Sequence, residues 1–259
     1  MDFVDGYRRY VALGDSQTEG LWDTDGRGDL RGFADRLAAQ LDSLYPGLEY
    51  ANLAVRGRRI DDVCREQLPA ALAMRPDLIT VCIGMNDVTR PGRRFDSALA
   101  ELEDLYDRLA RCGATVVTTT FPDIARIIPV GRVLAGRVHR INRTIRVASA
   151  HHRFRLVDLY AAASMTQPGT WSADRVHGSA RGHALFAAAA AEALGLPGSD
   201  HRWAAADADA ARPTPAARAR SQVQWTQNML MPWVWRHLRG VSSAQGRGPR
   251  RPALEPVSG

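Results

Sequence analysis

Short apolar runs alternate with longer segments of helical periodicity along the first 196 residues of the chain. The runs are rich in β-branched and aromatic side chains and are bounded by turn-forming residues, which is typical of β-strands. They lie at residues 10–13, 49–55, 78–83, 114–121 and 154–159. The run at 78–83 is almost continuously apolar, as expected of a strand that helices cover on both faces.

The segments between these runs place apolar residues three and four positions apart, which predicts amphipathic helices. They span residues 29–45, 60–74, 95–112, 131–152 and 180–194. Strands that alternate with helices form right-handed βαβ units, and such units place their strands in parallel. We therefore predict an α/β domain over residues 1–196, with a central parallel sheet and helices on both faces.

The composition changes after residue 196. Residues 197–218 are rich in Ala, Pro, Arg and Asp, which indicates a linker. Residues 219–239 carry three Trp among other apolar residues and predict an amphipathic helix, kinked or restarted at Pro232. We expect this helix to pack on the domain, while a lid over the cleft and a helix on a membrane surface stay open. Residues 240–259 are rich in Ser, Gly, Pro and Arg, so we expect a disordered basic tail.

Residue usage and charge exclude some function classes. All 34 basic residues are Arg, so the chain lacks the Lys that a P-loop and a pyridoxal enzyme both need. Most of the net charge of +6 lies after residue 199, where nine Arg and four acidic residues sum to +5. We expect this charge to belong to a solvated extension and not to a nucleic-acid site, although an anionic surface could attract it.

Cysteine spacing and hydropathy bear on metals and location. Cys64, Cys82 and Cys112 lie in apolar stretches without a CxxC or CxxH pattern, so we predict neither a disulfide framework nor a zinc site. No apolar signal core precedes residue 10, and no apolar run reaches the ~18 residues of a membrane span. These features predict a cytoplasmic chain, and they leave its oligomeric state open.

Residues suited to chemistry follow several of the predicted strands. Ser16 follows the first run, Gly57 the second and Asn86 the third. Asp174 and His177 stand three residues apart after the last run. Each of them alone is explained as well by turn chemistry, capping or a surface ion pair. Together, at the carboxyl ends of parallel strands, they would supply the hydroxyl, base, carboxylate and oxyanion donors of nucleophilic acyl transfer.

This order of segments resembles the SGNH hydrolases, also called GDSL esterases and lipases. The matching segments are Gly14-Asp15-Ser16, Gly57, Gly84-Met85-Asn86-Asp87 and Asp174 with His177, within a resemblance over about residues 8–195. It implies a three-layer α/β/α flavodoxin-like sandwich and a serine esterase that forms an acyl-enzyme without a metal or other cofactor. By the same resemblance Ser16 is the nucleophile, His177 the base and then the acid, and Asp174 the orienting carboxylate. The backbone N–H groups of Ser16 and Gly57 and the Asn86 side chain would form the oxyanion hole.

Three further expectations concern the surroundings of this site. Gly178 stands where the family often has Pro, so we expect a looser loop around His177, and we expect His183 to be structural. Residues 21–29 and 122–132 are expected to line the substrate pocket. The candidate substrate-binding residues are Asp15, Trp22, Phe121, Ile127 and Ile128. The aromatic and aliphatic ones favour an apolar acyl group.

The sequence leaves several activities open. The same site could transfer the acyl group to an alcohol, or act as a thioesterase or lysophospholipase. The expected partner is a small-molecule or lipid ester, and a peripheral membrane contact through residues 219–239 stays possible. A hypothesis of another class is a binding module without activity, recruited to nucleic acid or membrane through its basic tail.

Overall fold

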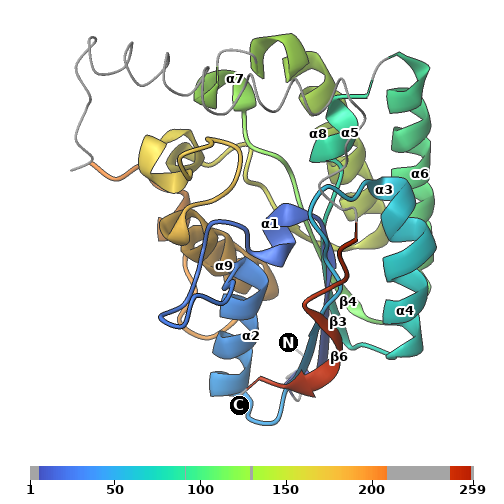
Figure 1. Cartoon of the computed structure of the whole chain (residues 1–259), viewed down its shortest axis with the longest axis vertical. Helices are drawn as coiled ribbons and strands as arrows, with labels where there is room; N and C mark the ends of the chain where they lie inside the picture. Colours follow the sequence, from blue (N-terminus) through green and yellow to red (C-terminus); the bar gives the residue numbers. More distant parts are fainter. Residues whose placement is uncertain (1–5, 91, 129–130, 209–245, 258–259) are drawn as a thin grey trace.

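A six-stranded sheet lies at the centre of the computed structural model, which describes residues 6–90, 92–128, 131–208 and 246–257 (Figure 1). The strands are β1 Arg9–Gly14, β2 Glu49–Asn52, β3 Leu78–Cys82, β4 Thr115–Thr119, β5 Arg155–Val157 and β6 Arg251–Pro256. Their order is β5-β4-β3-β1-β2-β6; β1 to β5 are parallel, and β6 is antiparallel to β2. The predicted α/β fold with a central parallel sheet is confirmed, with one antiparallel edge strand.

The sheet has its topological switch point at β1. After β1 the chain forms β2 on one side and then β3 on the other, so the carboxyl ends of β1 and β3 adjoin. In the register of this pair, Gly14 lies beside Cys82. The loops that follow two such strands leave in opposite directions and open a crevice between them, which is where open α/β sheets bind ligands.

Helices cover both faces of the sheet (Figure 1). On one face α2 (Phe33–Leu44) packs against α9 (Ala180–Leu194), and on the other α6 (Arg93–Ala110) packs against α8 (Gly131–His152). The remaining described helical segments are α1 Ser16–Glu19, α3 Ile60–Asp62, α4 Leu68–Ala73, α5 Met85–Val88, α7 Ile124–Ile127, the π-helical turn η1 Val63–Gln67, and the 3-10 turns η2 Ala163–Thr166, η3 Pro168–Thr170 and η4 His201–Ala204. The result is the expected three-layer sandwich.

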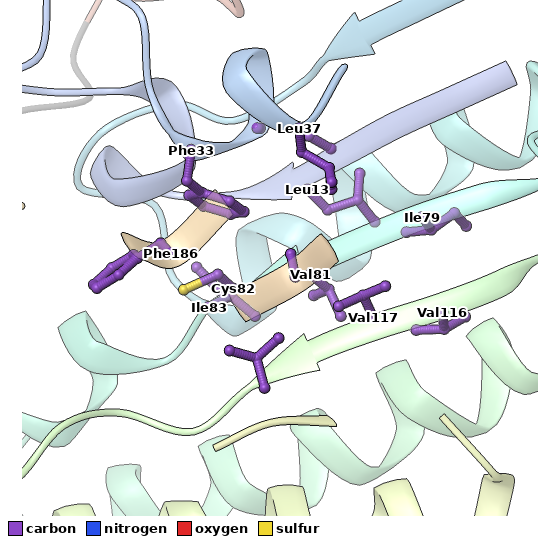
Figure 2. Packing of buried hydrophobic residues seen from close by; sticks show 14 of the residues in the cluster. Leu13, Phe33, Leu37, Ile79, Val81, Cys82, Ile83, Val116, Val117 and Phe186 are labelled. Carbon is purple, nitrogen blue, oxygen red and sulfur yellow. The ribbon is translucent and has the colours of Figure 1, made fainter. Parts of the chain in front are cut away.

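The apolar core joins these layers next to the switch point. β3 is buried along its whole length, as its continuous apolar run predicted. Figure 2 shows Phe33 and Leu37 of α2 close to Leu13 of β1, with Phe186 of α9 nearby. The ring centroids of Phe33 and Phe186 are 6.3 Å apart. Burial of each such side chain contributes ~1.5–3 kcal/mol, so α2 and α9 are held firmly beside the end of β1.

Helix bounds differ most from expectation near the start of α2. The helices predicted at 131–152 and 180–194 have the predicted bounds. The helix predicted from residue 29 begins only at Phe33, because a bridge between Thr24 and Leu30 closes a loop ahead of it. Gly32 caps α2, and its N–H donates to Asp35 at 2.9 Å.

The C-terminal segment is not a disordered tail, and that prediction is wrong for residues 251–256. They form β6 on the free edge of β2, where Asn52 lies opposite Arg251. Just before β6, Arg250 donates to Asp35 Oδ2 and to the Leu30 carbonyl, both at 2.8 Å. Pro-rich composition argues against a strand in the middle of a sheet, but an edge strand tolerates Pro because half of its backbone groups need no partner.

The boundary predicted at residue 196 also falls too early. η4 packs against α9, and Trp203 in it is buried with its indole N–H donated to the carboxylate of Glu192. The start of the predicted linker therefore belongs to the domain. The helix predicted at 219–239 lies outside the described residues. No helix within the described ranges is both long enough and apolar enough to cross a bilayer.

The contact of Arg250 gives a test of how the C-terminal segment docks. Arg250→Ala should lower the free energy of unfolding by about 1–3 kcal/mol, because it leaves the largely buried carboxylate of Asp35 without the guanidinium of Arg250. Arg247→Ala removes the same charge from an exposed position three residues earlier and should change the stability by less than about 0.5 kcal/mol. Chemical denaturation of both variants measures this, and equal effects would contradict the docking of β6.

Candidate active site

The segment after β1 is held by contacts to its backbone. Gly14 adopts φ +154°, and a Cβ atom there would lie only 2.5 Å from the Cys82 carbonyl oxygen, so glycine is needed. The side chain of Gln67 accepts from the Gly14 N–H and donates to its carbonyl, both at 2.9 Å. Asp15 then caps α1, which begins at Ser16. The Ser16 hydroxyl is therefore presented at the sheet edge by a rigid strand-to-helix turn.

Gln67 comes from an irregular part of the helix predicted at 60–74. The Leu68 N–H reaches back to the Val63 carbonyl and closes the π-helical turn η1. Pro69 follows and cannot donate a helical hydrogen bond. Such wide turns inside helices often occur beside functional sites, and here η1 carries the residue that binds Gly14.

The loop that carries His177 is a compact turn organised by one carboxylate. The Ser172 N–H donates to the His177 carbonyl at 2.8 Å and closes the turn. Asp174 Oδ1 accepts from the N–H groups of Val176 and His177, at 2.9 and 3.0 Å. Asp174 Oδ2 lies 2.7 Å from His177 Nδ1. The loop therefore sets the orientation of the imidazole by itself.

Ser16, His177 and Asp174 converge in space. His177 Nε2 lies 2.7 Å from Ser16 Oγ, across 161 positions of sequence. Because Nδ1 faces a carboxylate it carries the ring hydrogen, which leaves Nε2 free to accept the Ser16 hydroxyl proton. Burial alone would raise the pKa of Asp174, but hydrogen bonds from His177 and its neighbours outweigh burial and hold that pKa well below the usual range. The carboxylate thus stays ionised beside the imidazole.

Gly57 lies in the loop after β2. Its φ of +79° is in the left-handed region that favours glycine. Its neighbour Arg56 binds Glu19 of α1 through its backbone N–H at 2.7 Å and its guanidinium at 2.6 Å. The Glu19 side chain is only 8% exposed, so water screens this ion pair weakly. The pair ties the Gly57 loop to the helix that begins with Ser16.

Asn86 is the second residue of α5, the short helix that follows β3. Its Nδ2 donates to Asp15 Oδ2 at 3.0 Å and to the Arg58 carbonyl at 2.9 Å. The amide therefore connects the segments that follow β1, β2 and β3. A developing oxyanion would have to share one of these two hydrogens. Burial raises the pKa of Asp15 to about 6, against the opposing effects of a backbone hydrogen bond and of His177.

Comparison with protein families decides how this arrangement is classified. A model of the GDSL-like Lipase/Acylhydrolase family matches residues 12–185, which is more than half of the chain. The chain belongs to this family. It is accordingly a carboxylic ester hydrolase. A search of curated proteins found no match.

Solved structures share the fold of this family member at low sequence identity. An acetylxylan esterase from Geobacillus stearothermophilus, Axe2, aligns with a TM-score of 0.62 and 20% identity in a catalytic mutant, over 75% of this chain and 97% of that one. The hydrolase LAE5 from the metagenome of Lake Arreo, Spain, aligns with a TM-score of 0.58 and 22% identity, over 73% of this chain and 95% of that one. These likenesses support the SGNH fold.

The candidate substrate-binding residues of this GDSL-family hydrolase have different environments. Trp22 is 50% exposed and adopts φ +69°, so the loop after α1 presents its ring at the surface. Phe121 is buried, and its backbone is bound on both sides by the Asn142 side chain. Ile127 is packed partly against the core, and Ile128 is half-buried. Their roles in substrate binding stay predictions.

The expected loosening at Gly178 is not what the structure shows. Gly178 is buried, and its N–H donates to Gln17 Oε1 at 3.2 Å. Proline at this position would have no hydrogen to donate. The glycine therefore permits a contact that holds the loop.

Sequence reasoning missed the residues that support the site. Gln17, Gln67, Glu19 and Arg56 all bind loop backbone or one another across the crevice. No local signal marked Gln67 or Glu19, because each stands beside other polar residues in the sequence, although the fold buries both. The partners of the four residues are 37 to 161 positions away, so no local pattern could have named them.

His183 is structural, as expected. It is fully buried in α9; its Nδ1 accepts from the Phe33 N–H at 3.2 Å, and its Nε2 lies 3.1 Å from the Leu21 carbonyl. Both contacts require the neutral ring with its hydrogen on Nε2. Burial lowers the pKa of His183 below its usual value. The ring therefore connects α9 to the loop between α1 and α2.

Acid should weaken this connection. Because the folded pKa of His183 is lowered, the unfolded chain takes up the proton first, so this stabilising contribution is complete above about pH 6.5 and is lost as the pH falls below it. His183→Gln does not titrate here, so its melting temperature should fall less than that of the wild type between about pH 7.5 and 5. Parallel melting curves at several pH values measure this, and identical slopes would contradict it.

Proposed function

We propose that this esterase hydrolyses its substrate through an acyl-enzyme on Ser16, with His177 as the proton carrier and Asp174 as its orienting partner. The observation that supports this most strongly is the pair of 2.7 Å separations that join Ser16 Oγ to His177 Nε2 and His177 Nδ1 to Asp174 Oδ2. A hydroxyl bonded to an imidazole that a carboxylate orients is the arrangement that activates serine for acyl transfer.

The proposed reaction has two halves. In the first, Ser16 Oγ attacks the acyl carbon as Nε2 of His177 takes the hydroxyl proton. The tetrahedral intermediate then collapses, the bond from the acyl carbon to the alcohol oxygen breaks, and Nε2 returns the proton to that oxygen. In the second half a water molecule attacks the acyl-serine, with Nε2 again accepting and returning a proton, and the carboxylic acid leaves.

The oxyanion of each tetrahedral intermediate needs donors that are already in place. The proposed donors are the backbone N–H groups of Ser16 and Gly57 and the side-chain amide of Asn86. Support comes from the Arg56–Glu19 ion pair, which ties the Gly57 loop to α1, and from the Asn86 contacts to both neighbouring segments. Asp15 would then orient Asn86 and not contact the substrate, which differs from its expected role.

The acyl group is proposed from the neighbours and from the loops. The Axe2 structures are described as an acetylxylan or acetyl-xylooligosaccharide esterase, and three of them carry a catalytic serine, aspartate or histidine replaced by alanine. We infer that the present enzyme accepts esters of short acyl chains, with the exposed ring of Trp22 available to the alcohol portion. Acyl transfer to an alcohol, thioester cleavage and lysophospholipid cleavage remain alternatives at the same site, and product analysis with a competing acceptor separates them.

Removal of the nucleophile tests the proposal directly. Ser16→Ala should lower kcat for a p-nitrophenyl ester by roughly 10⁶-fold, the scale of other triad knockouts. Asn86→Ala should cost ~10²–10³-fold, because one oxyanion donor is lost while the triad stays. Steady-state kinetics measure both, with circular dichroism to show that the variants fold. Wild-type turnover by Ser16→Ala would refute the assignment. A wild-type protein that cleaves no ester, as expected of a binding module, would refute it as well.

The pH dependence of the reaction tests the base. kcat/KM should rise with pH, because only a neutral imidazole can accept the Ser16 proton. Asp15, whose pKa is raised to about 6 by burial, could produce a similar rise. In Asp15→Asn the rise should persist, whatever the absolute rate. A flat profile between about pH 5 and 8, or a rise that disappears in Asp15→Asn, would contradict His177 as the base.

A further inference from the structure

The carboxamide of Gln17 joins the nucleophile helix to the backbone on both sides of His177. Gln17 Nε2 donates to the Val176 carbonyl at 2.9 Å, and the Gly178 N–H donates to Gln17 Oε1 at 3.2 Å. We propose that Gln17 is a positioning residue that holds the His177 loop in register with Ser16, an inference that rests on the proposed triad. We call these two hydrogen bonds of Gln17 the clamp. Gln17 is next to Ser16 in α1, so the clamp and the nucleophile move together.

The His177 loop needs a connection to α1, because the hydrogen bonds within the loop fix its conformation but not its position relative to Ser16. Asp174 and the Ser172–His177 bond belong to the same turn as the imidazole and would travel with it. At the base of the turn, Trp171 and Gly178 form an isolated bridge, and Ser179 binds the Thr170 backbone. These contacts anchor the turn to the segment before it and not to α1.

Apolar burial contributes little to holding the tip of this turn. The Val176 side chain is 43% exposed, and Ala173 is exposed as well. A tip with little apolar burial depends largely on polar contacts for its position, and the open states of such segments cost little free energy. The two bonds from Gln17 fall on the residues that flank His177, where a shift of the backbone would move the imidazole directly.

A glutamine is suited to this position by its donor and acceptor pattern. Its amide presents one N–H and one carbonyl oxygen to a backbone carbonyl and a backbone N–H, and it does so without adding charge beside the imidazole. Methionine has a similar length but lacks both groups. Glutamate keeps the acceptor for Gly178, loses the donor for Val176, and brings a negative charge toward the ring. These two substitutions therefore separate the hydrogen bonds from the electrostatics.

The expected consequence is catalytic and not a loss of substrate affinity. A small displacement of a catalytic group can cost up to ~10²-fold in rate, because the geometry of proton transfer is lost. Gln17→Met should lower kcat by about tenfold or more while KM changes by less than about twofold, since both polar atoms of Gln17 bind the loop.

A second glutamine provides a matched control. Gln167 makes a similar pair of backbone hydrogen bonds, but to a single residue: it accepts from the Asp207 N–H at 3.0 Å and donates to the Asp207 carbonyl at 2.9 Å. Both glutamines are half-buried. Gln167→Met should therefore lower the melting temperature without changing kcat. A Gln17→Met kcat within about twofold of the wild type, or an equal kcat loss in Gln167→Met, would overturn the positioning role.

The pH profile gives a readout that a purely structural contact would not move. In Gln17→Glu the new carboxylate should stabilise the protonated imidazole, so the rise of kcat/KM should move to higher pH. A rise at the wild-type pH would show that residue 17 does not lie against His177 and would overturn the proposal.

The proposed function and this inference fail in different ways. Activity in Ser16→Ala would remove the triad itself. An inactive Ser16→Ala enzyme together with wild-type kcat and pH profile in both Gln17 variants would leave the triad standing and refute the clamp alone.

Discussion

The site depends on the parallel sheet and on the switch point at β1. Because β1 to β5 run in one direction, their carboxyl ends share one edge, and the loops that follow them reach a common space. The register that places Gly14 beside Cys82 brings the first residues of α1 and α5 together. Asp15 and Asn86 are 71 positions apart in sequence, yet this pair of strands brings their side chains within 3.0 Å of each other. The core around Leu13, Phe33 and Phe186 keeps that pair in place (Figure 2).

Beyond the carboxyl ends of the strands, hydrogen bonds and an ion pair between polar side chains hold the loops, in place of apolar packing. Gln67 binds Gly14, Glu19 binds Arg56, and Asn86 binds the Arg58 carbonyl, each from a different element. Single bonds of this kind contribute only ~0.5–1.5 kcal/mol to stability, so their importance lies in geometry. A hydrolase site must hold its groups to within about 0.5 Å, and backbone atoms bound from both sides meet that demand better than exposed loops do.

The fold could be predicted largely from the sequence because period and composition are local signals. The buried run at 78–83, the long helical repeats and the order of strands and helices were sufficient for the three-layer arrangement. Segments whose order depends on a distant partner could not be predicted in this way. β6 is Pro- and Arg-containing and becomes a strand only because β2 offers a free edge, and Trp203 becomes buried only because α9 lies beneath it.

The residues of the candidate site also fall into those that could be predicted from the sequence and those that could not. Ser16, Gly57, Asn86, Asp174 and His177 could be proposed because their residue types follow strands in an informative order, and the structure brings Ser16, Asp174 and His177 together. The supporting residues could not be proposed in this way, because the role of a glutamine or of an ion pair is evident only once its distant partner is known. The substrate-binding residues stay predictions, and their environments differ: Phe121 is buried, whereas Trp22 is open to solvent.

If His177 activates Ser16 as a nucleophile, a fluorophosphonate should label that serine covalently. The protein is incubated with a fluorophosphonate, digested, and the modified peptide is identified by mass spectrometry. We expect one adduct per chain, located on Ser16, and labelling that is strongly slowed in His177→Ala. An adduct on another residue, or no adduct on a protein that still cleaves esters, would contradict it.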